Sequence, residues 1–252
     1  APPSDPGRGS GAGGYGADSA GLVVGAGAAL PGHWRAGAAF AYARADVDGD
    51  PGIPSHTLDV RVRQLIGYAS LGLDERSDAS FQIDFGRNRN AGRRGVLGAV
   101  ASSAFDSHTL HAGASLARRF AFGENSFLAP SVRADYSRIR DEAYVETGAG
   151  LFNLAVDGQS IEEFIVGADA RLAHDYGNAA RVDAALGVGY DAINERASVT
   201  ATFAGAPGAA FATRGIAPSP WLGRAGLGLS YTLANGAELH ARYDAEFRQD
   251  FL

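Results

Sequence analysis

The feature that most constrains this chain is an alternation of apolar and polar side chains with a period of two residues. It is unbroken across residues 237–248. The odd positions hold Ala237, Leu239, Ala241, Tyr243, Ala245 and Phe247, and the even positions hold Glu238, His240, Arg242, Asp244, Glu246 and Arg248. Successive side chains of a strand point to opposite faces, so this segment predicts a strand with one apolar and one charged face.

The same alternation recurs along most of the chain and predicts about ten strands, most of them longer than the 5–6 residues usual in globular sheets. The 35 glycines and 10 prolines argue against an all-helical protein. No stretch approaches the roughly 18 apolar residues that a membrane-spanning helix needs. The 28 acids exceed the 22 bases and no basic cluster is present, which argues against nucleic acid as a partner.

The predicted connections alternate between short and long. Short ones lie at Pro31-Gly32, 74–78, 123–125, 176–178 and Asn235-Gly236, and long ones run roughly over 46–56, 89–103, 141–159 and 194–219. A soluble sandwich has no reason to sort its connections by side, whereas outer-membrane barrels have tight periplasmic turns and long external loops. The expected fold class is therefore all-β, an antiparallel up-and-down transmembrane β-barrel, placed in the outer membrane.

In a bilayer the apolar face must meet lipid and the charged face must line a wet lumen. The charged face is expected to carry Arg61 and Arg63 among other residues of both signs. The alternative is a soluble barrel with its apolar face inside. The residues predicted to line the lumen, as a transport path, are Arg133, Asp135, Asp169, Arg171, Arg242 and Glu246.

No catalytic, cofactor-binding or metal site is predicted. Residues 11–16 fit G-x-G-x-x-G, but no strand precedes them and no helix follows. Asp46, Asp48 and Asp50 have the spacing of a calcium loop, but that loop needs glycine where Pro51 stands. His108 and His111 lie three apart on a strand, so they point to opposite faces and cannot share a metal.

Several segments resemble the C-terminal β-domain, or translocator, of type V secretion autotransporters. The order and spacing of the motifs carry the resemblance, which covers most of residues 18–250. The motifs are Leu128-Ala-Pro130, Tyr136-Ser137-Arg138, Tyr144-Val-Glu146-Thr-Gly148-Ala149-Gly150, Leu154-Ala-Val156, His33-Trp34-Arg35-Ala-Gly37, Gly226-Leu-Gly228-Leu-Ser230-Tyr231 and Tyr243-Asp244-Ala-Glu246-Phe247.

The resemblance implies a barrel in the outer membrane of a Gram-negative cell that anchors an N-terminal passenger and helps to move it to the cell surface. It also implies no cofactor and no enzymatic activity. The partners that it implies are outer-membrane lipid, the chain's own passenger segment, a helix that threads the pore, and the cell's barrel-assembly machinery. Two alternatives from other classes are an outer-membrane enzyme with its site on the external rim, of protease or lipase type, and a passive porin.

The whole of residues 1–252 is expected to be one barrel domain, with 1–17 an external loop or linker. Both of its ends are expected on the long-loop side, whereas such barrels keep their termini in the periplasm. One missing strand at each end, and about twelve strands in the parent, would explain this. Ten strands that close on themselves are the alternative.

Overall fold

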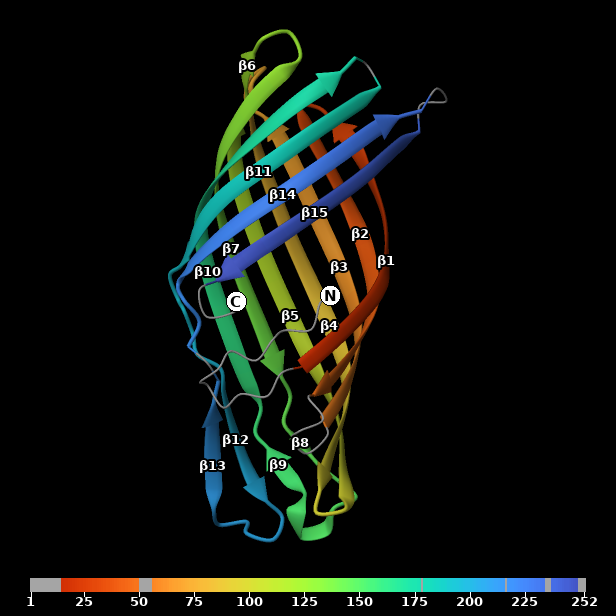
Figure 1. Cartoon of the computed structure of the whole chain (residues 1–252), viewed down its shortest axis with the longest axis vertical. Helices are drawn as coiled ribbons and strands as arrows, with labels where there is room; N and C mark the ends of the chain where they lie inside the picture. The colour runs from red at the N-terminus through yellow and green to blue at the C-terminus, as the bar shows by residue number, and fades with distance from the viewer. Residues whose placement is uncertain (1–14, 50–55, 178, 216, 234–236, 249–252) are drawn as a thin grey trace.

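The computed structural model describes residues 15–49, 56–177, 179–215, 217–233 and 237–248. They form a curved antiparallel sheet of eleven strands, whose main path runs β1-β2-β3-β4-β5-β7-β10-β11-β14-β15 while β6 pairs with β7 (Figure 1). The strands are β1 (Tyr15–Leu30), β2 (Trp34–Gly49), β3 (His56–Gly72), β4 (Ser77–Val96), β5 (Ala99–Arg118), β6 (Phe120–Phe122), β7 (Ser126–Asp141), β10 (Gln159–Tyr176), β11 (Ala180–Asp191), β14 (Trp221–Thr232) and β15 (Glu238–Arg248). The prediction of an antiparallel barrel with about ten strands is confirmed.

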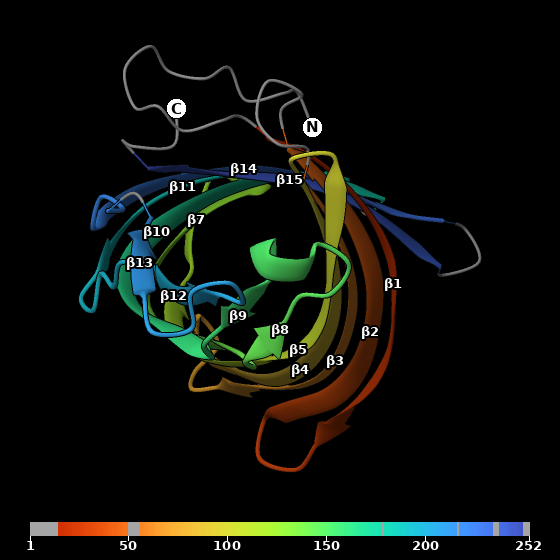
Figure 2. The same cartoon turned by 90° about the horizontal axis from the view of Figure 1, so that it is seen from below.

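The sheet curls into a barrel wall around a central space, seen end-on in Figure 2. Its two edges are β1 and β15, which are not paired with each other within the described residues. A second, four-stranded sheet lies at one end. It contains β8 (Tyr144–Val145), β9 (Leu154–Val156), β12 (Ser198–Phe203) and β13 (Ala210–Arg214), and a 3-10 turn, η1 (Gly150–Phe152), precedes β9.

Most large apolar side chains of the wall are exposed and point outward, and only a few, such as Leu222 and Phe127, are buried. Leu22, Leu186 and Tyr243 are 67%, 69% and 70% exposed, whereas Asp84 and Asp183, on the opposite face, are each 3% exposed. Apolar residues outside and charged residues inside are the arrangement that a lipid environment requires. Among the described residues, no helix is long and apolar enough to cross a bilayer.

The sorting of connections by side is largely as predicted. The described short turns join β1 to β2, β3 to β4, and β10 to β11, and a short segment with β6 joins β5 to β7. All of these turns lie at one end of the molecule, at the top of Figure 1. At the other end, the connections 142–158 and 192–220 are long and supply the second sheet. We refer to these two ends as the short-turn end and the long-connection end.

The prediction of a long loop over 89–103 is wrong. β4 and β5 stay paired to Val96 and Ala99, and only Leu97 and Gly98 form the turn. Both have positive φ, +46° and +83°, as a tight two-residue hairpin requires. Because Arg87, Arg89 and Arg93 occupy outward positions where apolar residues would be expected, this part of the hairpin lacks the alternation that marks membrane strands, although its backbone pairing continues.

The placement of Arg61 and Arg63 on the lumen face is also wrong. Arg63 is paired with Tyr42 and Arg87, and the next residue on the same face is Leu65, paired with Phe40 and Phe85. This is the outward face, and both arginines are exposed on it. The inward positions of β3 are instead Gln64, Ile66, Tyr68 and Ser70, which lie level with Asp84 and Gln82 of β4.

Some predictions lie outside the described residues. They are the glycine motif up to residue 14, Asp50 of the calcium-like spacing, and the turn at Asn235-Gly236. Strand β1 begins at Tyr15, three residues before the predicted start, so the described part of the expected 1–17 linker, residues 15–17, is strand.

Candidate functional site

The six residues predicted to line the lumen all lie on the inward face of the wall. Arg133 and Asp135 of β7 alternate with the outward Val132, Ala134 and Tyr136, and Asp169 and Arg171 of β10 share the face of Arg133. In β15, Arg242 and Glu246 lie opposite Gly228 and Arg224 of β14. The interleaved charges predicted from the alternation therefore face the central space.

A polar network crosses five neighbouring strands of this face. Asp84 of β4 accepts hydrogen bonds from Gln64 of β3 (2.5 Å) and Gln82 (2.8 Å), and it contacts His111 Nδ1 of β5 at 2.8 Å. His111 Nε2 lies 3.6 Å from Asp135 Oδ1 of β7. Asp135 pairs with Arg133, whose Nε lies 3.2 Å from Asp169 Oδ2 of β10. We name this chain from Gln64 to Asp169 the lumen network.

A second cluster centres on Asp183 of β11. Arg171 Nη2 donates to Asp183 Oδ1 at 2.6 Å, and Arg242 Nη1 lies 3.6 Å from Asp183 Oδ2. Arg242 also makes a two-pronged pair with Asp244, at 2.7 and 2.8 Å. One buried carboxylate thus holds two arginines from strands that lie on either side of β11 and β14.

Glycines on neighbouring strands make room for these carboxylates. A Cβ added at Gly228 would lie 2.6 Å from Asp183 Oδ1, and one added at Gly187 would overlap Asp169 Oδ1. No L side chain fits at such distances without displacing the acid. The carboxylates therefore lie flat against the wall, over backbone that carries no side chain.

Glu246 belongs to a third group near the long-connection end of β15. It lies 3.3 Å from Arg248 Nε, and Arg248 Nη2 donates to Glu163 of β10 at 2.9 Å. Arg248 is 11% exposed and also lies 4.0 Å from Asp191. Asp191 is 1% exposed and accepts the backbone N–H groups of Phe164, Ile193 and Asn194 at 3.1–3.2 Å.

A cavity of about 710 Å³ lies between these walls. It is lined from β2, β3, β4, β5, β7, β14 and β15, and three of the six predicted residues line it: Arg133, Asp135 and Glu246. Asp169, Arg171 and Arg242 lie on the same inward face but outside its lining. The alternation also puts Asp84 on the charged face and His111 opposite an apolar face, but it does not predict that they touch, because alternation identifies a face and not a contact between strands.

The connection 142–158 folds back over the open end of the barrel, and in Figure 2 η1 lies inside the ring of strands. It is fixed to β4 by Arg94, which donates to both carboxylate oxygens of Glu146 at 3.1 and 2.6 Å and to the carbonyl oxygen of Phe152 at 3.0 Å. Glu146 is 6% exposed. We call the pair Arg94–Glu146 the loop latch.

Two further contacts support the latch. Tyr144 stacks on Phe105 of β5 with ring centroids 4.4 Å apart, and burial raises the pKa of its hydroxyl. Thr147 exchanges backbone hydrogen bonds with Ser102, at 2.8 and 2.9 Å. Residues 144–150, one of the segments that carry the family resemblance, are therefore fixed to β4 and β5 at the long-connection end. The sequence does not predict the contact with Arg94, which falls in the expected loop 89–103.

Within the described part of the chain, no group of three His, Cys, Asp or Glu side chains could hold a metal ion. His108 and His111 point to opposite faces, as their spacing predicts: His108 lies level with the outward Arg140, and His111 lies level with the inward Ser137.

A comparison with protein families identifies one family. The model of the autotransporter beta-domain family matches residues 4–244. The translocator domain of the autotransporter NalP from Neisseria meningitidis superposes with a TM-score of 0.76 at 16% identity, over 94% of this chain and 77% of that one. The β-domain of the Bordetella autotransporter BrkA gives 0.59 at 16% identity, over 95% and 87%. No curated protein matches.

The family match spans nearly all of the chain, and it includes most of the barrel wall with its charged inward face. The chain belongs to the autotransporter β-domain family and is an outer-membrane β-barrel translocator, of type V secretion in a Gram-negative cell, that serves a passenger segment.

Proposed function

We propose that the inward charged face is the path along which the passenger segment crosses the membrane, lined by Arg133, Asp135, Asp169, Arg171, Arg242 and Glu246. The observation that carries the proposal is the cavity of about 710 Å³, which draws its lining from seven strands of the wall and includes charges of both signs. A polypeptide exposes backbone donors and acceptors, and a wall of paired charges meets these groups without binding any one sequence tightly.

The path can be tested by site-directed cross-linking. The chain contains no cysteine, so one introduced cysteine can be labelled specifically. Ser115 lines the cavity, and the next residue, Leu116, is 47% exposed on the outward face. We expect a photoreactive group on Ser115→Cys to capture the passenger segment during secretion. The matched control, Leu116→Cys, should capture lipid only. Equal capture of passenger at both positions would argue against an inward path.

The role of the lumen charges is tested at Arg171. Arg171→Glu places a like charge beside Asp183, which is 3% exposed and still has Arg242 within 3.6 Å. We expect severalfold less passenger at the cell surface with an unchanged amount of folded barrel. Arg171→Gln should have a smaller effect, and Arg118→Glu, at the short-turn end, should have none. Normal display in Arg171→Glu would remove this residue from the path.

We further propose that the domain is not itself an enzyme. Three inward carboxylates are paired with arginines: Asp183 with Arg171 and Arg242, and Asp169 and Asp135 with Arg133. The carboxylate of Asp84 is held by Gln64, Gln82 and His111. The same pairing argues against an enzyme on the external rim that uses these carboxylates. The pore helix and the barrel-assembly machinery are proposed as partners on the family resemblance alone.

A further inference from the structure

We propose that the outward face of β2–β7, at the long-connection end, binds the phosphate groups of outer-leaflet lipid head groups. The proposed site is a double row of arginines that the strand register places side by side. We call it the arginine belt: Arg44, Arg61, Arg63, Arg87, Arg89 and Arg140.

The register fixes the belt directly above the lipid-facing surface. The apolar row Phe40, Leu65, Phe85 and Leu110 runs across β2 to β5 on the outward face. Two residues nearer the long-connection end, the next outward row consists of Tyr42, Arg63, Arg87 and His108. Arg140 continues this row on β7. The row beyond that holds Arg44, Arg61, Arg89 and Asp106.

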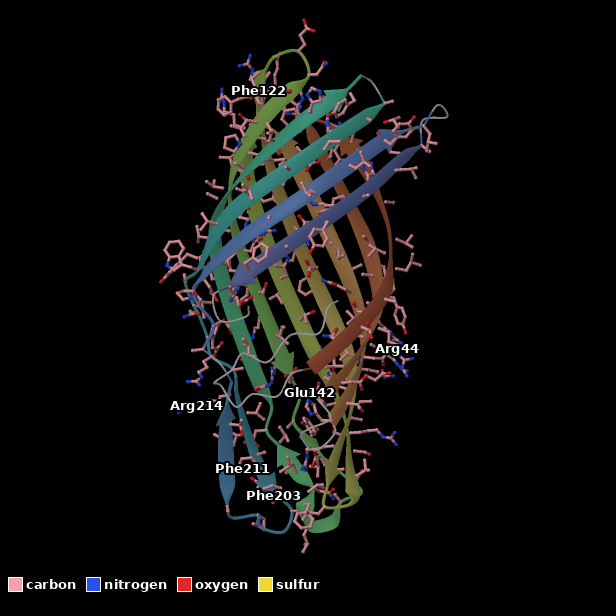
Figure 3. The ribbon with its side chains drawn as sticks, in the orientation of Figure 1. Arg44, Phe122, Glu142, Phe203, Phe211 and Arg214 are labelled. Atoms are coloured by element: carbon pink, nitrogen blue, oxygen red, sulfur yellow. The ribbon has the colours of Figure 1, made fainter. Side chains whose placement is uncertain are left out.

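The belt is solvent-exposed and only partly neutralised. The side chains of Arg44, Arg61, Arg87 and Arg89 are 53%, 57%, 59% and 68% exposed, and in Figure 3 Arg44 projects away from the barrel. Asp59 pairs with Arg44 and Arg61, Asp46 also pairs with Arg44, and Asp106 pairs with Arg87 and, at 3.9 Å, with Arg89. Arg63 and Arg140 have no ion pair within the described residues.

The chemistry of the belt favours phosphate. All 22 bases of the chain are arginine, whose planar guanidinium holds phosphate oxygens through two parallel hydrogen bonds. Same-face residues two apart lie about 7 Å from each other along a strand, so two rows match a single layer of head groups. An acidic pair, Asp46 and Asp59, lies level across β2 and β3 just beyond the second row and limits the belt on its outer side.

The opposite side of the barrel has no counterpart. The outward positions of β11, β14 and β15 carry no charged residue within the described part of the chain. Head groups would therefore be held on one side of the barrel only. The inference goes beyond passenger transport, and it rests on the orientation expected from the sequence, in which the long connections face outside.

The test uses the full-length protein, purified from outer membranes in neutral detergent and titrated with diphosphorylated lipid A, its dephosphorylated form, or inorganic phosphate. Bound lipid is counted by native mass spectrometry. We expect diphosphorylated lipid A to bind and Arg63→Gln/Arg87→Gln/Arg140→Gln to weaken it by roughly tenfold or more, since each basic group near a lipid surface contributes on the order of 1 kcal/mol. The matched control, Arg76→Gln/Arg118→Gln/Arg119→Gln, removes equal charge at the short-turn end and should bind as the parent does.

Three results would overturn the proposal: equal binding of the dephosphorylated lipid, equal loss in the control, or displacement of the lipid by inorganic phosphate at matched concentration, which would assign the belt to free phosphate. Arg63→Gln/Arg140→Gln, which disturbs no ion pair among the described residues, gives the same test if the triple variant does not fold.

Labelling of Leu97→Cys on intact cells checks the orientation separately. Leu97 is 83% exposed at the tip of the β4–β5 hairpin, so absence of labelling would place the error in the orientation and not in the belt's chemistry.

Discussion

The strands β3–β5 and the strands β11, β14 and β15 belong to the same wall but end differently. The first group has 17 to 20 residues per strand and the second has 11 or 12. At the long-connection end, β11 and β14 finish with Tyr190 and Trp221, an edge-to-face pair with centroids 5.0 Å apart. β3 and β4 pass through their apolar segments and continue into arginines on the same outward face.

The difference between the two groups shows that the alternation of side chains and the length of a strand carry different information. The period of two decides which face a side chain occupies, but it does not say where along the strand the bilayer ends. In the short strands every outward position is apolar, and an aromatic pair marks the boundary, as aromatic girdles do in membrane barrels. In the long strands the outward face turns from apolar to cationic partway, and the remaining hairpin extends beyond the lipid.

The largest effect should come from placing a charge on the outward face at the middle of a short strand. Leu227 of β14 is 62% exposed there, and Leu227→Arg should cost about 2–4 kcal/mol of barrel stability, as arginine does near a bilayer midplane. Ala91 of β4 lies beyond both arginine rows, so Ala91→Arg should cost about 0–1 kcal/mol. Urea unfolding in lipid vesicles, followed by heat-modifiable mobility, measures both. Equal costs would contradict the proposed boundary.

A smaller and local effect is expected at the loop latch. Arg94→Ala leaves the buried Glu146 carboxylate without its cation, which should favour opening of the connection 142–158 by about 2 kcal/mol, or roughly 30-fold. Limited proteolysis of that connection measures the change, and the unfolding midpoint of the barrel should stay the same. The neighbouring Arg93 is exposed and has no ion pair among the described residues, so Arg93→Ala serves as the control. Unchanged cleavage in Arg94→Ala would mean that the Tyr144–Phe105 stack and the Thr147–Ser102 hydrogen bonds hold the connection without the latch.

The smallest effect is expected at the short-turn end. The backbone N–H groups of Arg76 and Ser77 each donate to Asp74 Oδ1 at 2.7 Å. These hydrogen bonds, first of all the one from Arg76, hold the pKa of the Asp74 carboxyl below its ordinary value of 3.8. Because the pKa is lowered in the folded state, the contribution is present above pH 3.8 and is lost as pH falls through the folded value. The protection factor of the Ser77 amide against hydrogen exchange should fall over that range, and Asp74→Asn should remove this pH dependence. The same dependence in the variant would exclude Asp74 as its source.

Much of this architecture follows from the sequence, because a strict period of two over long segments predicts strands with one apolar and one polar face. In a membrane the apolar face must meet lipid, and in a soluble barrel it must face the core. The alternation predicts that Arg133, Asp135, Asp169, Arg171, Arg242 and Glu246 share one face, and in the structure they share the inward face. It failed at Arg61 and Arg63, which lie on the outward face, in the part of β3 where that face carries arginines in place of apolar residues. It also could not find the latch, since Arg94 and Glu146 are 52 residues apart and only the folded connection brings them together.

The lumen network from Gln64 to Asp169 has a mechanical consequence. The backbone ladder fixes how many strands a wall contains, yet a ring of given circumference can still flatten into an ellipse. Side chains tied across five consecutive strands, from β3 to β10, resist that change of cross-section on their side of the wall. That side should therefore bend less than the backbone ladder alone would allow, and a moving segment would find there a surface of nearly fixed curvature.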